Sequence, residues 1–277
     1  MQEYKVPPNT ILLTVVTVTF NDPVGLLRTI SSMSNLPEHG IQHVIVDGGS
    51  DRESLDLSRS LATTKRMVIV ERDEGIYDAM NKGLKHAVGE YVVFMNGGDE
   101  FHPQFQLPFL LKESRGQRRV LLGYSVEVFG RDRYLTPGLG KEAKVFASPS
   151  HQATFYPKAF YLGAKFDKSS PVSADGKLTR EALKSHGGIF VPTVVCFFHL
   201  GGLSTSYGDL AFVVKRVREL HLKGKALVLM KAILWRLLPQ RTFYRLLASY
   251  KYTRISDSGT VSRDFLAAPV AFEPVTG

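Results

Sequence analysis

Four short apolar segments alternate with amphipathic ones along the first hundred residues. The apolar segments cover residues 11–19, 42–46, 67–71 and 91–95, and valine or isoleucine recurs in each of them. Runs of this length and composition are typical of strands that are covered on both faces. Strands that alternate with helices across short loops predict βαβ units and a parallel sheet. These residues therefore predict an α/β unit of the nucleotide-binding type.

The segments between the predicted strands have helical spacing and recognisable ends. Asp22, followed by a proline, suits the N-cap of a helix over about 22–33. A second helix is expected over about 53–62, and a third over 77–87, where apolar residues recur on one helical face. Gly89 is expected to cap the third helix at its C-terminal end.

Residues 104–206 have a less regular pattern. Strands are expected at 120–129, 151–156 and 189–198, and helices over 104–112 and 173–186. Residues 131–150 are rich in proline and glycine and predict a long loop. We expect this part to complete one globular domain that covers residues 1–206.

The basic residues of the chain are concentrated near its C-terminus. Residues 215–254 contain eleven lysines and arginines against one acid, Glu219, which gives this segment a net charge of +10. The whole chain carries +9, so the remainder has a net charge of −1. An acidic partner would therefore bind the C-terminal segment.

The same segment predicts amphipathic helices, interrupted at Pro239. At 100° per residue one stripe without charge contains Ala226, Leu227, Met230, Ile233, Leu234, Leu237 and Leu238. We expect residues 207–256 to form a basic helical unit whose 215–254 part lies on an anionic membrane surface. The alternative is that the stripe packs on the sheet domain. Residues 257–277 have weak periodicity and are expected to be poorly ordered.

Composition narrows the class of protein. Hydrophobic residues make up 44% and charged residues 22%, as in soluble globular proteins. Cys196 is the single cysteine, which excludes an internal disulfide and a cysteine-based metal cluster. Every apolar run is shorter than the roughly 20 residues that span a bilayer, and the N-terminal segment is a poor signal peptide. We therefore expect a cytoplasmic protein.

Polar residues follow each predicted strand of the first half. The candidates for ligand contact are Thr19, Asn21, Asp47, Asp73, Asn96, Gly98 and Asp99. Open α/β sheets bind ligands at the carboxyl edge of their strands, and all of these residues fall on that edge. His151, Gln152 and Asp175 in the second half are further candidates.

Several candidates also have a structural interpretation. Asp47 and Asp175 are suited to capping the helices that follow them, and Asp73 is suited to a turn. His151 by itself is suited to a buried structural role. Asp99 differs, because two glycines beside a carboxylate after a buried strand allow close approach of a ligand and have little structural purpose.

The loop after the first strand contains no glycine-rich phosphate-binding motif. Its absence argues against a dinucleotide oxidoreductase and a P-loop nucleoside triphosphatase. A nucleoside diphosphate is more readily held through a divalent cation on Asp99, since Mg²⁺ is usually bound by one or two carboxylates together with substrate phosphates.

The clusters together resemble family 2 glycosyltransferases of the GT-A fold, and most closely bacterial exopolysaccharide enzymes of the colanic-acid type. The matching segments are TVVTVTFND (14–22), VIVDGGSD (44–51), ERDEGIYDAMNKG (71–83), VVFMNGGDEFHP (92–103), HQATFYP (151–157), SAD (173–175) and GGLST (201–205). They run in the family's order and cover about 190 residues.

The resemblance implies a role for each candidate residue. Contacts to the donor nucleotide are implied for Thr19, Asn21, Asp47, Asp73, Asn96 and Gly98. Asp99 matches the end of the family's metal-binding motif, which implies Mg²⁺ or Mn²⁺. Asp175 matches the general base, and His151 with Gln152 matches an acceptor-side motif. Many members have two or three acids where this chain has one certain carboxylate, Asp99, with Glu100 beside it.

The implied protein is an inverting glycosyltransferase with a mixed, mostly parallel sheet flanked by helices. Residues 1–103 would form the nucleotide-sugar half and residues 104–206 the acceptor half. The implied acceptor is a lipid-linked saccharide at the inner face of the cytoplasmic membrane, in surface polysaccharide assembly. The alternative is a non-catalytic membrane-surface scaffold with a degenerate donor site. Nucleic acid is not expected as a partner, because the C-terminal stripe is aliphatic and lacks stacking aromatics.

Overall fold

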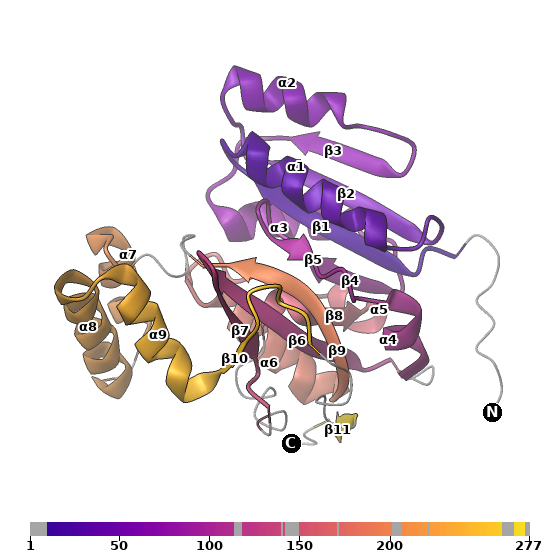
Figure 1. Cartoon of the computed structure of the whole chain (residues 1–277). Coiled ribbons are helices and arrows are strands. Elements are labelled where there is room, and N and C mark those ends of the chain that lie inside the picture. Colours follow the sequence, from indigo (N-terminus) through magenta and orange to yellow (C-terminus); the bar gives the residue numbers. More distant parts are fainter. Residues whose placement is uncertain are drawn as a thin grey trace.

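A mixed β-sheet with helices on both faces forms the body of the protein (Figure 1). The structure is a computed structural model that describes residues 10–113, 118–139, 141, 150–170, 172–200, 207–220, 222–261 and 269–274. The strand order is β10-β7-β6-β8-β4-β1-β2-β3, and β9 pairs with β6, β5 and β11. This architecture is the α/β fold that the sequence predicts.

The N-terminal half contains the parallel part of the sheet. Its elements are β1 (Leu13–Thr19), α1 (Pro23–Ser32), the short 3₁₀ helix η1 (Met33–Asn35), β2 (Ile41–Asp47), α2 (Arg52–Ser60), β3 (Arg66–Val70), α3 (Ile76–Leu84) and β4 (Tyr91–Phe94). Strand β1 pairs in parallel with both β2 and β4, and β2 with β3. Every residue of β1 and β4 is buried, as expected for strands covered on both faces.

The second half continues the sheet with mostly antiparallel pairings. Its elements are β5 (Glu100–Phe101), α4 (Leu107–Glu113), β6 (Val120–Phe129), β7 (Asp132–Thr136), the 3₁₀ helix η3 (His151–Ala153), β8 (Thr154–Pro157), α5 (Lys158–Tyr161), α6 (Ala174–His186) and β9 (Gly188–His199). Strand β8 joins the halves, because it pairs with β4 on one side and with β6 on the other.

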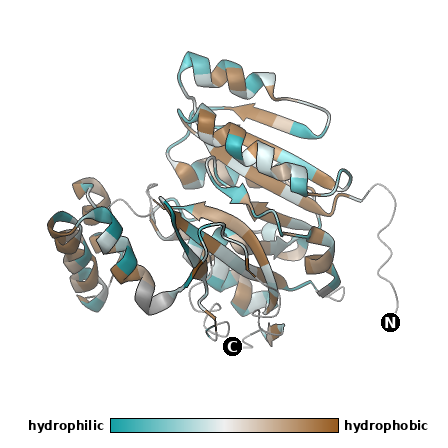
Figure 2. Cartoon of the chain, viewed as in Figure 1, coloured by the Kyte–Doolittle hydropathy of each residue, from teal (hydrophilic) through white to brown (hydrophobic). Residues whose placement is uncertain are grey.

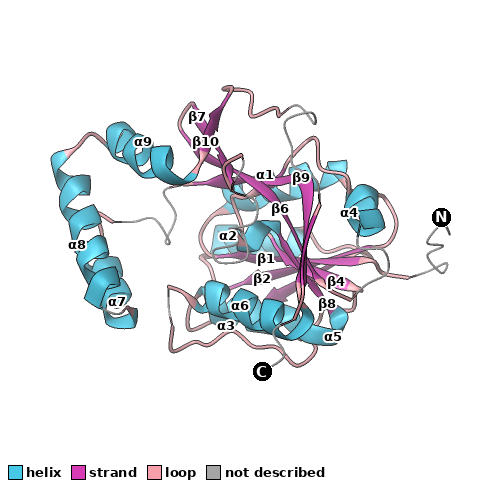
Figure 3. Ribbon diagram, turned by 90° about the horizontal axis from the view of Figure 1, so that it is seen from below, coloured by secondary structure: helices cyan, strands magenta, loops and turns pink. Residues whose placement is uncertain are grey.

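Three helices, α7 (Leu210–Glu219), α8 (Leu222–Leu237) and α9 (Gln240–Lys251), extend from one side of this body. Figures 1 and 3 show them beside the sheet rather than on its faces. The chain then returns to the sheet, where β10 (Thr253–Ile255) pairs with β7 and β11 (Val270–Phe272) pairs with β9. Within the described residues, no helix is both long and apolar enough to cross a membrane.

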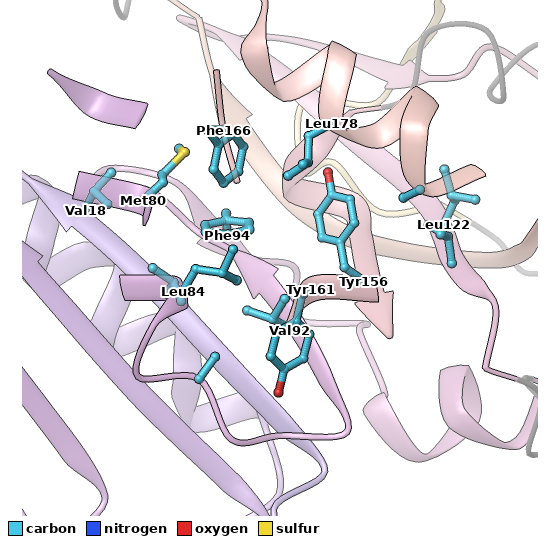
Figure 4. Close-up of a cluster of buried hydrophobic side chains, with 14 of the residues drawn as sticks. Val18, Met80, Leu84, Val92, Phe94, Leu122, Tyr156, Tyr161, Phe166 and Leu178 are labelled. Atoms are coloured by element: carbon cyan, nitrogen blue, oxygen red, sulfur yellow. The ribbon is translucent and has the colours of Figure 1, made fainter. Parts of the chain in front are cut away.

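Side chains that alternate along the strands form two hydrophobic clusters, one on each face of the sheet. One packs against α3, α5 and α6, the other against η1 and α4, and these helices lie on opposite sides of the sheet in Figure 3. Phe94 occupies the centre of the first cluster (Figure 4). Its ring makes edge-on contacts with Phe166 and Tyr156, with ring centroids 4.9 Å and 6.1 Å apart. This core fixes β4, which leads to the Asn96–Asp99 turn.

Several local expectations differ from the structure. Strand β7 lies in the segment that was expected to be a long loop, and the edge strand β3 is only partly buried. Helix α3 ends at Leu84, so Gly89 is not its C-cap. Gly89 instead lies against β1, where a Cβ would come within 2.6 Å of the backbone nitrogen of Thr14. The strand expected over 151–156 begins only at Thr154, because His151 and Gln152 belong to η3.

Some residues of the C-terminal tail, which was expected to be poorly ordered, pack against the body in the part that the structure describes. Val261 is buried in the main core, and β11 continues the sheet beside β9. The pairing partners lie some eighty residues apart in sequence, Val270 opposite Phe190. Local periodicity therefore carries little trace of this strand.

Asp132 fastens the helical unit to the sheet. Its carboxylate is buried and accepts hydrogen bonds from Arg241 and Arg245 of α9 and from Arg254 of β10. Hydrogen bonds from Arg241 and Arg245 hold the pKa of Asp132 well below its usual range. Two of the arginines expected to face lipid phosphates, Arg241 and Arg245, thus bind a carboxylate of the body instead.

We expect Asp132→Asn to lower the free energy of unfolding by about 2 kcal/mol, since hydrogen bonds to charged groups are worth roughly that much. The depressed pKa makes this contribution complete above about pH 4, the unfolded-state value, and lost as the pH falls below it. Denaturant unfolding between pH 3 and pH 7 measures the loss of unfolding free energy and its dependence on pH. The control is Asp56→Asn, which removes an exposed pairing with Arg52. Equal effects of the two substitutions would contradict the role of Asp132.

Candidate active site

A cleft of about 1670 Å³ opens at the carboxyl edge of the parallel strands. It is lined by eight of the ten predicted site residues, namely Thr19, Asp73, Asn96, Gly98, Asp99, His151, Gln152 and Asp175. The ends of β1 and β4, the loop before α3, the η3 turn and the start of α6 contribute these residues. The topology therefore brings the clusters of both halves of the chain into one site.

Asn21 and Asp47 are absent from the lining and hold the loops behind it. The buried carboxylate of Asp47 accepts hydrogen bonds from the backbone N–H groups of Gly49 and Ser50 and from the Ser58 hydroxyl, at 2.7–3.1 Å. The amide oxygen of Asn21 accepts the N–H of Asp51 at 2.7 Å. The Asn21 bond ties the loop after β1 to the loop after β2, and the Asp47 bonds hold the β2–α2 loop against α2. Asp47 does not cap α2, because the N-cap of that helix is Asp51.

Asp73 occupies the space beside Gly48 at the edge of the cleft. A Cβ on Gly48 would lie 2.2 Å from Oδ2 of Asp73, so only glycine leaves room for this carboxylate. Its other oxygen accepts the N–H of Gly75 at 2.9 Å. Partial burial raises the pKa of Asp73 above its ordinary value.

The Asn96–Asp99 turn is shaped by a glycine and by a threonine on α1. Gly98 has a φ of +99°, a left-handed conformation that side chains disfavour. Its N–H donates to the hydroxyl of Thr29 at 3.0 Å, and that hydroxyl lies 2.6 Å from the carbonyl oxygen of Asp99. The sequence offered no reason to select Thr29, because Thr29 lies outside the Asn96–Asp99 motif that it supports.

Asp99 is almost completely buried, yet both of its carboxylate oxygens have donors. Gln152 Nε2 donates to Oδ2 at 3.1 Å, and the backbone N–H of His199 donates to Oδ1 at 3.4 Å. Burial raises the pKa of Asp99 to about 7, and the nearby charge of Glu100 adds to the effect. Glu100 itself accepts a hydrogen bond from the His199 ring at 2.8 Å. His199 also lines the cleft and therefore belongs to the site.

The oxygen atoms of this turn suit a divalent cation whose coordination a ligand completes. Asn96 Oδ1 is buried and has no hydrogen-bond partner among the described residues, and both Asn96 and Asp99 line the cleft. An amide oxygen and a carboxylate are ligands that Mg²⁺ accepts alongside phosphate oxygens. Within the described part of the chain, no group of three or more histidines, cysteines or acids is placed to hold a metal ion.

Asp175 lies in the first turn of α6, and its side chain is oriented by Tyr77. The Tyr77 hydroxyl donates to Oδ1 of Asp175 at 3.1 Å. Burial, and then the charge of Asp175, raise the pKa of Tyr77, so the hydroxyl remains a donor at neutral pH. The N-cap of α6 is Ser173, so capping does not explain Asp175. Tyr77 was recognised in the sequence only as part of an apolar helix face.

His151 is buried beside the cleft, with its ring stacked on Phe94 at 6.1 Å. Burial lowers its pKa, which keeps the imidazole neutral near pH 7 although the charge of Asp175 opposes this. Within the described residues its Nδ1 has no hydrogen-bond partner. A neutral ring with an unused nitrogen on the cleft is suited to contact a polar ligand group.

Helix α7 forms a wall of the same cleft. Asp209 at its N-cap and Ala211, Phe212 and Lys215 in its first two turns line the cavity. The basic helical unit therefore contributes directly to the site, which the charge pattern did not indicate. The GGLST segment (201–205), which precedes α7, lies outside the described residues.

Comparisons with known proteins identify the family. Residues 14–167 match the family described as glycosyl transferase family 2. An uncharacterised glycosyltransferase of Mycobacterium tuberculosis is 28% identical over 225 residues, which are 76% of this chain and 84% of that protein. A PGL/p-HBAD biosynthesis glycosyltransferase of Mycobacterium bovis is 30% identical over 94 residues, or 33% of this chain and 37% of that protein.

Solved structures show the same fold. The chain resembles S. aureus TarS 1-349 in complex with UDP at a TM-score of 0.56 and 17% identity, over 83% of this chain and 73% of TarS. The complex of the same protein with UDP-GlcNAc gives a TM-score of 0.58 at 17% identity, over 80% and 71% of the two chains. Because the family match covers more than half of the chain and the fold agrees, the protein belongs to glycosyltransferase family 2 and is a glycosyltransferase of the GT-A fold.

Proposed function

We propose that the protein is an inverting glycosyltransferase that moves a sugar from a nucleoside-diphosphate sugar to an acceptor hydroxyl. The observation that carries this proposal is that Asp175, oriented by Tyr77, opens on the same cleft as Asp73, Asn96 and Asp99. A base and a diphosphate-binding turn on one cavity are what a direct displacement requires. The TarS structures with UDP and UDP-GlcNAc support a nucleotide-sugar donor.

In the proposed reaction Asp175 removes the proton of the acceptor hydroxyl as that oxygen attacks the anomeric carbon. The new carbon–oxygen bond forms as the bond to the diphosphate breaks on the opposite side, so an α-linked donor gives a β-linked product. Asp99 and Asn96 would hold Mg²⁺ or Mn²⁺, which when bound would supply Lewis-acid stabilisation of the departing diphosphate. Gln152 holds the Asp99 carboxylate, and neutral His151 offers an imidazole nitrogen to the acceptor side.

The acceptor that we propose is a lipid-linked saccharide in polysaccharide assembly at a membrane surface. Helix α8 presents the exposed apolar residues Leu222, Leu229, Met230, Ile233 and Leu237, and Figure 2 shows the resulting hydrophobic colour of this helix. On a helical wheel they share one arc with exposed Lys223 and Arg236 at its borders. An apolar face bordered by basic residues is typical of a helix that lies in a bilayer interface.

The charges available for lipid phosphates differ from those expected. Arg241 and Arg245 are paired with Asp132. The ammonium group of Lys231 lies 5.6 Å from the centre of the Tyr207 ring, and burial lowers the pKa of Lys231. Lys223 and Arg236 are exposed beside the apolar arc. We therefore propose that apolar burial of α8 dominates membrane binding and that the remaining basic residues add about 1 kcal/mol each.

Asp175→Asn should fold and bind donor normally while kcat falls by about 10²- to 10⁴-fold, the usual contribution of a general base. Transfer from nucleotide sugars and thermal shift with UDP, GDP, dTDP and CMP measure the two properties. Glu181→Gln is the matched control, because Glu181 is exposed on the same helix. Near-full activity of Asp175→Asn together with a lower melting temperature would show that Asp175 only stabilises α6.

Stabilisation by Mn²⁺ and a nucleoside diphosphate should strengthen from pH 6 to pH 8. The pKa of Asp99 is about 7, and a cation binds the ionised carboxylate, so affinity should rise nearly 10-fold per unit below that pH and then level off. Asp99→Ala should lose both the cation requirement and this pH dependence. Full activity of wild type in EDTA, with Asp99→Ala also active, would remove the cation from the mechanism.

Ile233→Glu combined with Leu237→Glu should abolish binding to phosphatidylglycerol vesicles without unfolding the protein, because both residues are exposed on α8. Wild type should co-sediment with these vesicles in a salt-dependent manner and weakly with neutral ones. Leu162→Glu, an equally exposed leucine of the body, is the control and should bind as wild type does. Equal sedimentation of all three proteins, or a dimer in solution that only the α8 variant disrupts, would contradict membrane docking.

A further inference from the structure

Glu219, the single acidic residue of the basic 215–254 segment, does not face solvent. Its side chain is 9% exposed and lies at the last position of α7. Oε1 accepts the backbone N–H of Val172 at 3.0 Å, and Oε2 accepts the hydroxyl of Ser173 at 2.5 Å. Arg216, one turn earlier on the same helix, lies 3.7 Å from Oε2. Both carboxylate oxygens are therefore used on the short segment that leads into α6.

The two residues that Glu219 holds directly precede the first turn of α6, which contains Asp175. Ser173 is the N-cap of this helix, but its hydroxyl makes no capping hydrogen bond and donates to Glu219 instead. A serine at an N-cap ordinarily accepts an N–H of its own helix. Ser173 thus uses its hydroxyl to link the start of α6 to α7.

Apolar packing strengthens the same contact. Phe212 and Val213 of α7 form a small core with Val228 and Ala232 of α8, and Val172 packs against that core. Phe212 also lines the cleft. The segment before α6 is thus held by α7 through both hydrogen bonds and apolar contacts.

Asp175 is consequently held from two directions. Tyr77 of α3 fixes its carboxylate, and Glu219 of α7 holds the backbone N–H of Val172 and the hydroxyl of Ser173 just before it. A movement of α7 would displace the start of α6, whereas Tyr77 would stay in place because α3 packs on the sheet. The direction in which the Asp175 carboxylate points then depends on the packing of the C-terminal helices.

We propose that Glu219 is a positioning residue that sets the place of Asp175 in the cleft, and that it makes the basic helical unit part of the catalytic apparatus. The proposal rests on the proposed role of Asp175 as the base. A displacement of reacting groups by about 1 Å costs up to 10²-fold in rate. Donor binding, which involves the strand ends, should be affected far less.

The test compares kcat and the KM for the nucleotide sugar in five variants, one of which is a control. Glu219→Ala should lower kcat by about 10- to 100-fold with a nearly unchanged KM. Glu219→Gln should restore most of the activity, since its amide can still bond both Val172 and Ser173. Ser173→Ala should lower kcat in the same direction, and the double variant should be no worse than Glu219→Ala alone. Glu181→Ala on α6 is the control and should behave as wild type.

The outcomes separate this proposal from the proposed function. Wild-type kcat in Glu219→Ala, while Asp175→Asn is inactive, would overturn the positioning role and leave the base assignment intact. Full activity of Asp175→Asn would overturn both. Should Glu219→Ala fail to fold, Ser173→Ala decides, because it removes one hydrogen bond of the same contact: an unchanged kcat would overturn the proposal, and a lowered kcat with unchanged KM would support it.

Discussion

The complete burial of β1 and β4 is the constraint on which the rest of the structure depends. Both strands are covered on both faces, so they carry apolar residues and small threonines, and polar chemistry is confined to their ends. Because the two strands are parallel neighbours, Thr19 and Asn96 reach the same edge of the sheet. The second half of the chain joins through β8, which brings the η3 turn and α6 to that edge. One cleft results, lined from both halves.

Burial also sets the character of the site. Asp99 has little contact with water, and burial raises its pKa to about 7 although the hydrogen bonds from Gln152 and His199 oppose this. Such a carboxylate is readily ionised only when a positive charge arrives, which suits a turn that binds a cation together with a diphosphate. Asp175 is more exposed and has the Tyr77 hydroxyl as its donor. The two acids of the proposed reaction thus lie in different surroundings, as their different tasks require.

Two carboxylates join the C-terminal helices to the body. One belongs to the body and contacts the helices, and the other belongs to the helices and contacts the body. Asp132 of the sheet binds three arginines of α9 and β10, and Glu219 of α7 binds the segment before α6. The helical unit borders the cleft through α7 and also presents an exposed apolar face on α8. Because α8 packs on α7 and α7 lines the cleft, the membrane contact proposed for α8 would lie one helix away from the cleft that is proposed to bind the acceptor.

The sequence by itself determined the first four strands with the helices between them, the burial of β1 and β4, the cluster of polar residues at the strand ends and the family. These features are local, because spacing, capping residues and short motifs act within a few residues. The edge strand β3 is only partly buried, although the sequence predicted cover on both faces. Only the tertiary structure decided that Asp47 holds loops while Asp99 faces the cleft, that β11 continues the sheet, and that Tyr77 and Glu219 hold Asp175 and its segment. The contacts of Asp99, β11, Tyr77 and Glu219 join residues more than forty positions apart in the sequence. The direction of a side chain and the distance to its partner are set by packing, which no local pattern records.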